Sequence, residues 1–156
     1  MDAVKQFWQQ YLATLPDDHP HRTATYEAWA FGDVNDAELA DELGALVLHG
    51  EKRATASLIW EYEADDEPMP QVGEISIVLD GRNEPLCIIE TTELRTLPYN
   101  EVDAQFAHDE GEGDRSLEYW RQAHWRFFGR VCERMGREVT ETMPVLCERF
   151  KLIYPV

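Results

Sequence analysis

Residues 106–114 form an acidic stretch, FAHDEGEGD, whose side chains could do chemistry. Four carboxylates and two glycines fall within residues 109–114. Such a stretch can bind a metal, supply a catalytic acid or base, or form the polar start of a helix. Its order lacks the alternating ligands, central glycine and distal glutamate of an EF-hand calcium loop. The pattern therefore disfavours a metal site and leaves catalysis and helix capping open.

Two glycines, Gly111 and Gly113, indicate the backbone conformation of this acidic stretch. Glycine costs chain entropy, so a pair around Glu112 predicts unusual backbone angles or the close approach of another group. The lip of a pocket would justify that cost, which makes Glu112 a candidate pocket residue. Asp114 suits the N-cap of the helix that follows it, and Asp109 is expected to be solvated.

A second stretch, GEKRATAS at residues 50–57, combines cationic and hydroxyl side chains. It lacks the glycine spacing of a Walker phosphate loop. Lys52 and Arg53 alone are typical of solvated residues at a helix exit, whereas Thr55 and Ser57 would share one face of a strand. If Lys52 were desolvated, its pKa would fall and it could act as a base toward a hydroxyl, with a carboxylate to orient it or donate a proton.

The aromatic segment near residue 120 has two interpretations. Trp120, His124, Phe127 and Phe128 recur at the spacing of one helix face, which favours a core stripe over a base-stacking platform. His124 is expected to be a hydrogen-bonded structural histidine. Arg121 lies one residue off this stripe and is a candidate partner of the acidic turn.

Length and charge restrict the class of protein. A chain of 156 residues is enough for one domain with a real core. The formal net charge of -17 argues against a protein that holds long phosphate backbones through many cations. We therefore expect no DNA partner, and a small neutral ligand is compatible with the composition.

Cysteine and histidine spacing gives no sign of a metal or another cofactor. Cys87, Cys132 and Cys147 are widely spaced and are expected to be reduced, mostly buried thiols. The remaining histidines show no zinc-like spacing: His19, His21, His49 and His108. No stretch is apolar enough to span a bilayer and no secretion signal is evident, so we expect a soluble cytoplasmic protein without a membrane partner.

Helical periodicity appears in three segments. Apolar positions from Val4 to Leu15 predict a first helix that Pro16 closes, followed by a polar connection. A second helix is predicted over residues 37–47, where Asn35 and Glu38 resemble a capping box and Gly50 suits the exit. A third is predicted over residues 117–135.

Strand-like patterns lie between and after these helices. They cover residues 54–62, 74–79, 85–94 and 143–154, and residues 80–83 have the composition of a hairpin turn. The order of elements predicts an α+β fold with a mostly antiparallel sheet or a small barrel.

Several stretches together resemble the ASCH domain family from about residue 26 to the C-terminus. They are WAFGD at 29–33, GEKRATAS at 50–57, FAHDEGEGD at 106–114, YWRQAH at 119–124, FF at 127–128 and CERF at 147–150. The resemblance implies a single PUA-like mixed β-barrel with peripheral α-helices. The first helix, within about residues 1–25, looks like an addition found in longer bacterial members.

The family resemblance also implies an activity. A compact bacterial branch resembles amidohydrolases that deacetylate N4-acetylcytidine, with motifs G-x-K-x-x-T and A-x-x-E. Matched residue by residue, these motifs place the catalytic roles on Lys52, Thr55 and Glu110. This chain departs from that branch in its length, in the EGEGD extension, and in Arg53 and Ala54 between the lysine and the threonine.

The leading hypothesis is therefore a cofactor-free hydrolase of a small modified nucleoside. Lys52 would be the base for a Thr55 nucleophile in a water-poor pocket, Glu110 would position the base or protonate the leaving amine, and glycine N–H groups at 111 and 113 would bind the oxyanion. Further substrate contacts are expected from Trp29, Phe31, Arg53, Ser57, Glu112 and Arg121.

Two other functions stay open. ASCH proteins are similar to RNA-binding PUA modules, and some resemble ribonucleases of single-stranded RNA. In an RNA-binding module Lys52 and Arg53 would touch phosphate, and Trp29 or Trp120 would stack a base. A sensor of a small metabolite would use the same pocket without chemistry.

Overall fold

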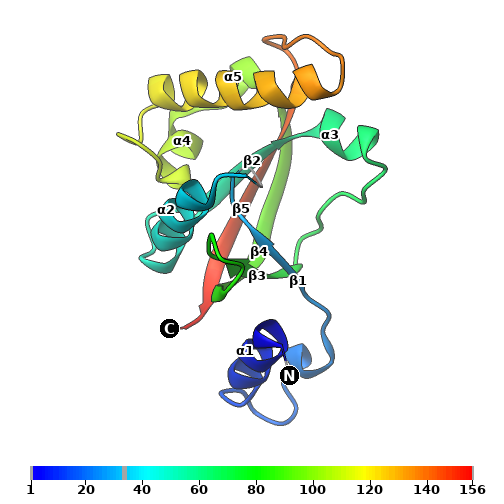
Figure 1. Cartoon of the computed structure of the whole chain (residues 1–156), viewed down its shortest axis with the longest axis vertical. Coiled ribbons are helices and arrows are strands. Elements are labelled where there is room, and N and C mark those ends of the chain that lie inside the picture. Colours follow the sequence, from blue (N-terminus) through cyan, green and yellow to red (C-terminus); the bar gives the residue numbers. More distant parts are fainter. Residues whose placement is uncertain (1, 33–34, 156) are drawn as a thin grey trace.

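The computed structural model describes residues 2–32 and 35–155. Asp33, which ends the WAFGD stretch, lies outside the described residues. The helices are α1 (Ala3–Leu12), α2 (Ala37–Leu48), α3 (Ile59–Ala64), α4 (Ala104–Glu110) and α5 (Leu117–Arg134), with short 3-10 turns at Pro20–Thr23 and Tyr99–Glu101. The strands are β1 (Glu27–Ala30), β2 (Ala54–Leu58), β3 (Ile75–Leu79), β4 (Pro85–Pro98) and β5 (Pro144–Tyr154) (Figure 1).

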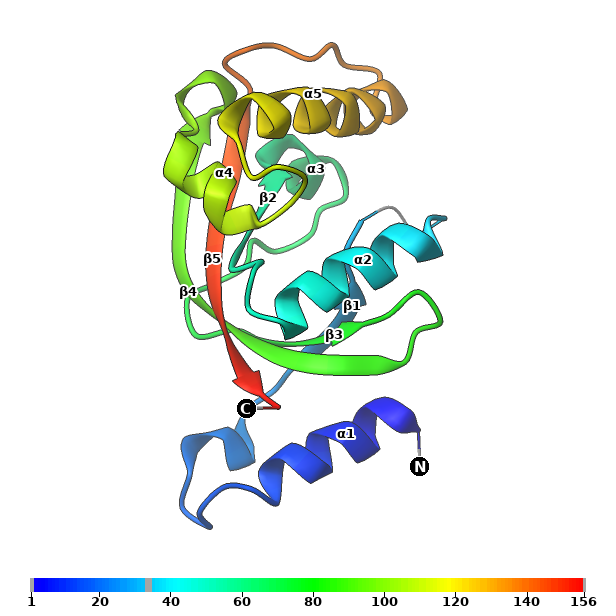
Figure 2. The ribbon, with the colours of Figure 1, turned by 90° about the vertical axis from the view of Figure 1, so that its left-hand side faces the viewer.

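The five strands form one sheet in the order β1-β3-β4-β5-β2. β1 runs parallel to β3, and the other neighbours are antiparallel. The sheet curls into a half-barrel, with α5 across one end and α1 beyond the other (Figure 2). The predicted α+β class and mostly antiparallel sheet are confirmed.

The two longest strands give the sheet its curl. β4 and β5 pair from Ile88 opposite Tyr154 to Pro98 opposite Pro144, with two shifts of register along the way. Shifts of this kind increase local twist and bend the bulged strand. The bent ladder brings β2, at one edge, beneath α4 and α5, and this places the GEKRATAS stretch beside the acidic turn.

Three apolar clusters stabilise the half-barrel. One joins α4 and α5 to β2 and β5 through side chains such as Leu58 and Phe128. Another packs α2 on the sheet through Val47 and Val78. The third attaches α1, where Trp8 is buried against the strands. The site described below lies between the first two clusters, on elements that both clusters hold in place.

Element boundaries differ from the sequence predictions in several places. The strand predicted over residues 54–62 ends at Leu58, because its partner β5 begins at Pro144 and offers no ladder beyond that point. Residues 59–64 turn instead into α3. Asp36, not Asn35, caps α2, since its carboxylate accepts the Leu39 N–H at 2.9 Å.

Other elements are longer, shorter or absent from the sequence predictions. β4 extends to Pro98, beyond the predicted end at residue 94, because β5 pairs with it that far. The short strand β1 and the helix α4 were not predicted, and α1 ends at Leu12 rather than Leu15. The Arg22 guanidinium donates hydrogen bonds to the Leu12 and Leu15 carbonyls, which have no partner within the helix once it ends at Leu12.

The predicted cysteine environment is confirmed. All three thiols are free and buried. Burial raises the pKa of both Cys87 and Cys147 to about 12, so these thiols stay protonated and unreactive at neutral pH. None of the helices in the described part of the chain has the length and apolar character needed to cross a membrane.

Candidate functional site

Lys52 lies at the centre of the candidate site. It follows the exit from α2, where Gly50 adopts a φ of +83°, and it precedes the first residue of β2. Only 2% of the residue is exposed. Its Nζ donates to Glu112 Oε2 at 2.8 Å, to Glu110 Oε1 at 3.1 Å and to the Glu110 carbonyl at 3.3 Å. The ammonium thus has all three of its protons directed at oxygen atoms.

The acidic stretch packs directly on the backbone before β2. Gly111 ends α4 in the left-handed conformation, and a Cβ there would lie 2.5 Å from the Glu51 carbonyl oxygen. A Cβ at Gly113, which also has positive φ, would meet the Tyr119 ring at 2.5 Å. The predicted close approach at both glycines is confirmed. It is what lets the carboxylates on either side of Gly111 reach the Lys52 ammonium.

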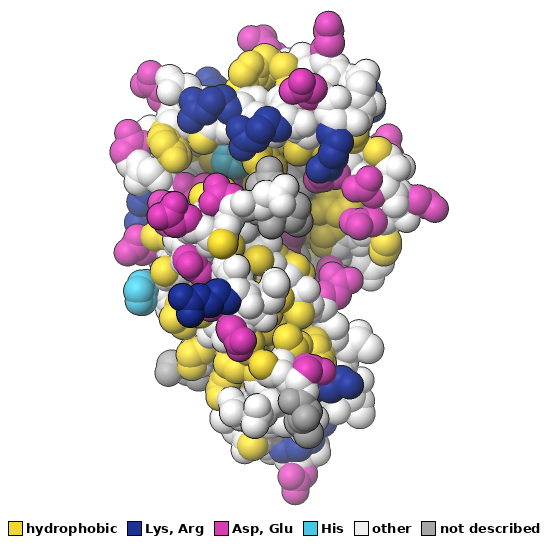
Figure 3. Space-filling view, in the orientation of Figure 1, with side chains coloured by type: hydrophobic (Ala, Val, Ile, Leu, Met, Phe, Trp, Pro, Cys, Tyr) yellow, Lys and Arg dark blue, Asp and Glu magenta, His cyan; other side chains and the backbone are white. Residues whose placement is uncertain are grey.

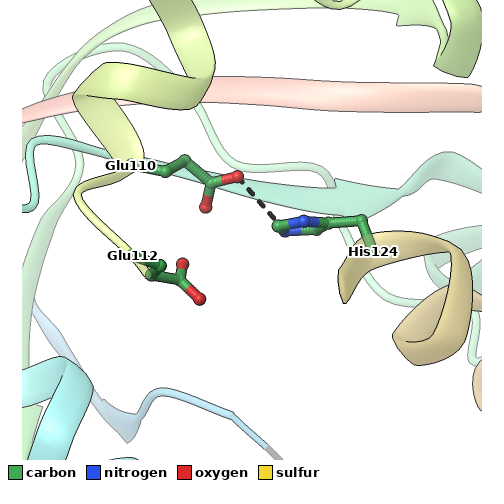
Figure 4. Close-up of side chains that lie close together, drawn as sticks. All are labelled: Glu110, Glu112 and His124. Atoms are coloured by element: carbon green, nitrogen blue, oxygen red, sulfur yellow. Dashed lines mark ion pairs between the residues drawn. The ribbon is translucent and has the colours of Figure 1, made fainter. Parts of the chain in front are cut away.

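Glu110 holds the floor of the site. It is the last residue of α4 and is 1% exposed. One carboxylate oxygen contacts Lys52, and the other accepts the Trp120 indole N–H and lies 3.2 Å from His124 Nε2. Figure 4 shows this ion pair, with Glu112 on the loop beside it. Each Glu110 oxygen therefore has a donor at a fixed position.

His124 is held between two acceptors. Its Nδ1 is 2.9 Å from the Trp120 carbonyl, and its Nε2 faces the Glu110 carboxylate. A carbonyl and a carboxylate can only accept, so both ring nitrogens must carry protons to satisfy this arrangement. In agreement, the pKa of His124 is raised: burial lowers it, but Glu110, Glu112 and the Trp120 carbonyl together outweigh burial.

The charges of the site support one another. Burial alone would raise the pKa of Glu110, but His124 and Lys52 lower it to about 2. Burial alone would lower the pKa of Lys52, but Glu110 and Glu112 raise it above its ordinary value. The expectation of a neutral lysine in the resting pocket is therefore wrong, because two carboxylates of the acidic turn stabilise the ammonium.

Two adjoining cavities open beside these charged groups. The Lys52 cavity has a volume of about 220 Å³, and a larger acidic cavity of about 830 Å³ lies next to it. Phe31, Gly32 and Thr55 line both. Residues of α5 line the Lys52 cavity: Tyr119, Ala123, His124, Arg126, Phe127 and Arg130. A ligand in the Lys52 cavity would thus contact α5 on one side and β2 on the other.

Comparison with known proteins identifies the family. The ASCH domain family model matches residues 27–154. The chain belongs to the ASCH domain family. Among solved structures, an ASCH domain from Lactobacillus crispatus JV V101 is 38% identical, with a TM-score of 0.91 over 97% of this chain and 94% of that one. No curated protein matches the chain significantly.

Two further solved structures extend the comparison. A protein from Enterococcus faecalis V583 is 33% identical, with a TM-score of 0.84 over 97% of this chain and 88% of that one. A hypothetical protein that is 14% identical, with a TM-score of 0.54 over 83% of this chain and all of its own, shares the fold alone. The predicted PUA-like fold with peripheral helices is confirmed for this ASCH domain.

The tertiary structure brings the residues of the family motifs into one cavity. Lys52, Thr55, Glu110 and Glu112 all line the Lys52 cavity. Thr55 is half-buried, and its hydroxyl takes part in none of the side-chain hydrogen bonds found among the described residues, including those of Lys52 and Ser57. This ASCH domain thus presents an uncommitted hydroxyl to the same space as a buried ammonium.

The other predicted substrate contacts divide into two groups. Phe31 lines both cavities, while Trp29 and Ser57 line the larger one, where Ser57 Oγ is 3.0 Å from the Tyr62 hydroxyl. Arg53 and Arg121 line neither. Arg53 pairs with an aspartate at 2.9 Å, and Arg121 donates to a backbone carbonyl at 3.5 Å.

Two predictions for the acidic turn are wrong. Asp109 is not solvated: it is buried and pairs with Arg53 and with Arg149, because α4 directs it toward the sheet. Asp114 does not cap α5. Ser116 does, accepting the Tyr119 N–H at 3.1 Å, and Asp114 accepts the Ser116 N–H one turn earlier. The sequence does contain a residue suited to the N-cap of α5, and it is Ser116.

Several cavity residues were missed by the sequence analysis. The helical spacing predicts a structural His124 and a core Phe127, and it indicates no site role for Tyr119, Arg126 or Arg130. The apolar stripe of α5 could not reveal them, because a helix side that borders a cavity has the same spacing as one that borders the core.

One atom from each of Glu110, Glu112 and His124 could bind a metal ion, and these three atoms lie within 4.8 Å of one another. The Lys52 ammonium already lies against both carboxylates, and together with the protonated His124 it balances their two negative charges. A divalent cation at this place would have to displace the Lys52 ammonium. The displaced ammonium would then be buried without a carboxylate partner from the acidic turn. The residues therefore fit an ammonium better than a metal ion.

Acid is expected to destabilise this ASCH domain through Glu110. Its pKa is about 2 when folded, against 4.5 ordinarily, so its stabilising contribution is complete above pH 4.5 and is lost as the pH falls toward 2. Thermal melting from pH 7 downward would show this loss. Glu110→Gln should lack it and should melt lower at pH 7, and a variant with the wild-type dependence would contradict the assignment.

Proposed function

We propose that this ASCH domain is an amidohydrolase that removes the acyl group from a small N-acylated nucleoside, with N4-acetylcytidine as the best candidate. One observation carries the proposal: a fully buried lysine and an uncommitted threonine hydroxyl face one small cavity, and the lysine is paired with a carboxylate that is partly open to that cavity. Such a group can move protons for a hydroxyl nucleophile.

The resting state stores a proton on Lys52. A neutral nucleoside that fills the cavity would remove water from Glu112, whose side chain is 21% exposed. Loss of water disfavours a charged pair, so one proton passes from Nζ to the Glu112 carboxylate, which lies 2.8 Å away. The products of this transfer are a neutral amine and a carboxylic acid, which together supply the base and the acid of the reaction.

The chemistry then proceeds through an acyl-enzyme. The neutral Nζ takes the hydroxyl proton while Thr55 Oγ1 bonds to the amide carbonyl carbon. The renewed ammonium stabilises the oxyanion. Collapse breaks the C–N bond, and the carboxylic acid of Glu112 gives its proton to the leaving nitrogen. Water then hydrolyses the threonine ester and releases the carboxylic acid product.

Glu110 acts as a positioning residue in this scheme. Trp120 and His124 fix its carboxylate, and its Oε1 fixes Nζ at 3.1 Å. Gly111 is not free to bind the oxyanion, because its N–H donates to the His108 carbonyl at 3.1 Å. The scheme therefore assigns the oxyanion to the ammonium of Lys52 in place of the Gly111 N–H.

The direct test is hydrolysis of N4-acetylcytidine. The purified protein should release cytidine and acetate in equal amounts, measured by chromatography, and Glu112→Gln should slow release by about 10²–10⁴-fold. Folded protein that releases no cytidine would overturn the proposal.

A salt series separates this function from binding of long RNA. Turnover of a neutral nucleoside should change little with salt, whereas affinity for a phosphate backbone falls steeply. The net charge of -17 weighs against the RNA alternative. Tight, strongly salt-dependent binding of single-stranded RNA, without hydrolysis of the nucleoside, would favour it.

A further inference from the structure

Two arginines of α5, Arg126 and Arg130, line the Lys52 cavity and form no ion pair with another described residue. Arg126 and Arg130 are one helical turn apart, both are exposed, and both line this cavity. Among the described residues, neither forms an ion pair. The Arg130 guanidinium lies 5.8 Å from the centre of the Phe127 ring, which directs it along the cavity wall.

Other arginines of the described residues, Arg121 among them, also form no ion pair, so what distinguishes Arg126 and Arg130 is that they line the cavity. The next arginine along the same helix face, Arg134, contacts Glu61 at 2.6 Å. Arg53 and Arg149 both pair with Asp109. Figure 3 shows basic side chains in a row over α5, while separate acidic side chains are scattered over the remaining face. Uncompensated cations at the mouth of a cavity favour an anionic ligand.

We propose that the ligand of the Lys52 cavity carries a single phosphate, as a nucleoside monophosphate does, and that Arg126 and Arg130 bind it. This inference rests on the proposed function and names its substrate class. A cavity of about 220 Å³ takes a base and sugar, and leaves the phosphate at the exposed mouth. Guanidinium groups suit this role because their N–H groups match phosphate oxygens in pairs.

The neighbouring cavity explains why the ligand has one phosphate rather than a chain of them. Its lining includes five glutamates: Glu27, Glu61, Glu67, Glu74 and Glu148. It adjoins the Lys52 cavity across Phe31, Gly32 and Thr55, so a polynucleotide that continued past the site in this direction would bring phosphates against carboxylates. The acidic lining therefore selects against longer strands.

The test compares ligands that differ by one phosphate. Isothermal titration calorimetry should show cytidine 5′-monophosphate binding at least about tenfold more tightly than cytidine, a difference that equals about 1.4 kcal/mol. Arg126→Gln/Arg130→Gln should make the two affinities equal. Arg121→Gln is the matched control, since Arg121 is exposed on the same helix but lines neither cavity. It should keep the wild-type preference.

Several results would overturn the inference. They are equal affinities for the two compounds in the wild type, a phosphate preference that survives in the double variant, binding of neither compound by the folded protein, and tighter binding of a ten-residue oligocytidylate than of the monophosphate. The two proposals can fail separately. If the protein hydrolyses the amide but shows no preference for the phosphate, the proposed reaction is supported and the phosphate assignment is wrong. If it prefers the phosphate but does not hydrolyse the amide, the phosphate assignment is supported and the proposed reaction is wrong.

Discussion

Replacing Thr55 by valine is expected to lower the rate of N4-acetylcytidine hydrolysis by at least about 10³-fold while the protein stays folded. Valine keeps the shape of threonine and removes the hydroxyl that would attack the amide. The Thr55 hydroxyl takes part in none of the side-chain hydrogen bonds among the described residues, and the residue is only half-buried, so the free energy of unfolding should change by less than about 1 kcal/mol. Turnover and urea denaturation measure the two effects.

Two matched variants make the Thr55 experiment specific. Thr55→Ser keeps a hydroxyl at the same place and should retain most of the turnover. Ser57→Ala, two residues further along the same strand, removes a hydrogen bond to Tyr62 in the larger cavity and should have little effect on the chemical step. A Thr55→Val protein that hydrolyses the amide at the wild-type rate would rule out the acyl-enzyme.

Replacing Lys52 by methionine is expected to abolish turnover and also to lower the free energy of unfolding by about 3–5 kcal/mol. Methionine fills a similar volume but leaves the carboxylates of Glu110 and Glu112 without their shared ammonium. Removing one partner of a buried ion pair leaves an uncompensated charge, which costs more than the pair contributes. Urea denaturation of the variant measures the loss.

A double-mutant cycle identifies which carboxylate causes that loss. Glu110 is 1% exposed, whereas the Glu112 side chain is 21% exposed and can be solvated. Lys52→Met should therefore couple strongly to Glu110→Gln, with a double variant less destabilised than the sum of the two single variants, and more weakly to Glu112→Gln. Additive effects at Glu110 would show that the buried pair does not stabilise the fold.

Local patterns in the sequence predicted much of the fold. Short runs rich in β-formers predicted β3 and most of β4 and β5, and helical spacing predicted α2 and α5, because these elements bury apolar side chains against the core. The same patterns did not predict β1 or α4. They also predicted a strand over residues 54–62, whereas β2 ends at Leu58. In each case the deciding factor was a partner strand or a packing surface that lies far away in the sequence.

The candidate site was predicted unevenly for a related reason. The motifs pointed to Lys52, Thr55 and Glu110, and the two glycines correctly predicted a close approach of other groups. Spacing could not predict that Asp109 would be buried beside Arg149, a residue 40 positions away. It also could not distinguish a helix face that borders a cavity, which is where Arg126 and Arg130 lie.

By itself the sequence determined the class of fold, the burial of the cysteines and the identity of the groups available for chemistry, because these follow from composition and from short periodic patterns. Only the tertiary structure decided the protonation of Lys52. Its Nζ meets carboxylates 58 and 60 residues away, and their attraction outweighs the burial that would otherwise make the amine neutral. A pKa depends on distances in space, which residue order does not contain.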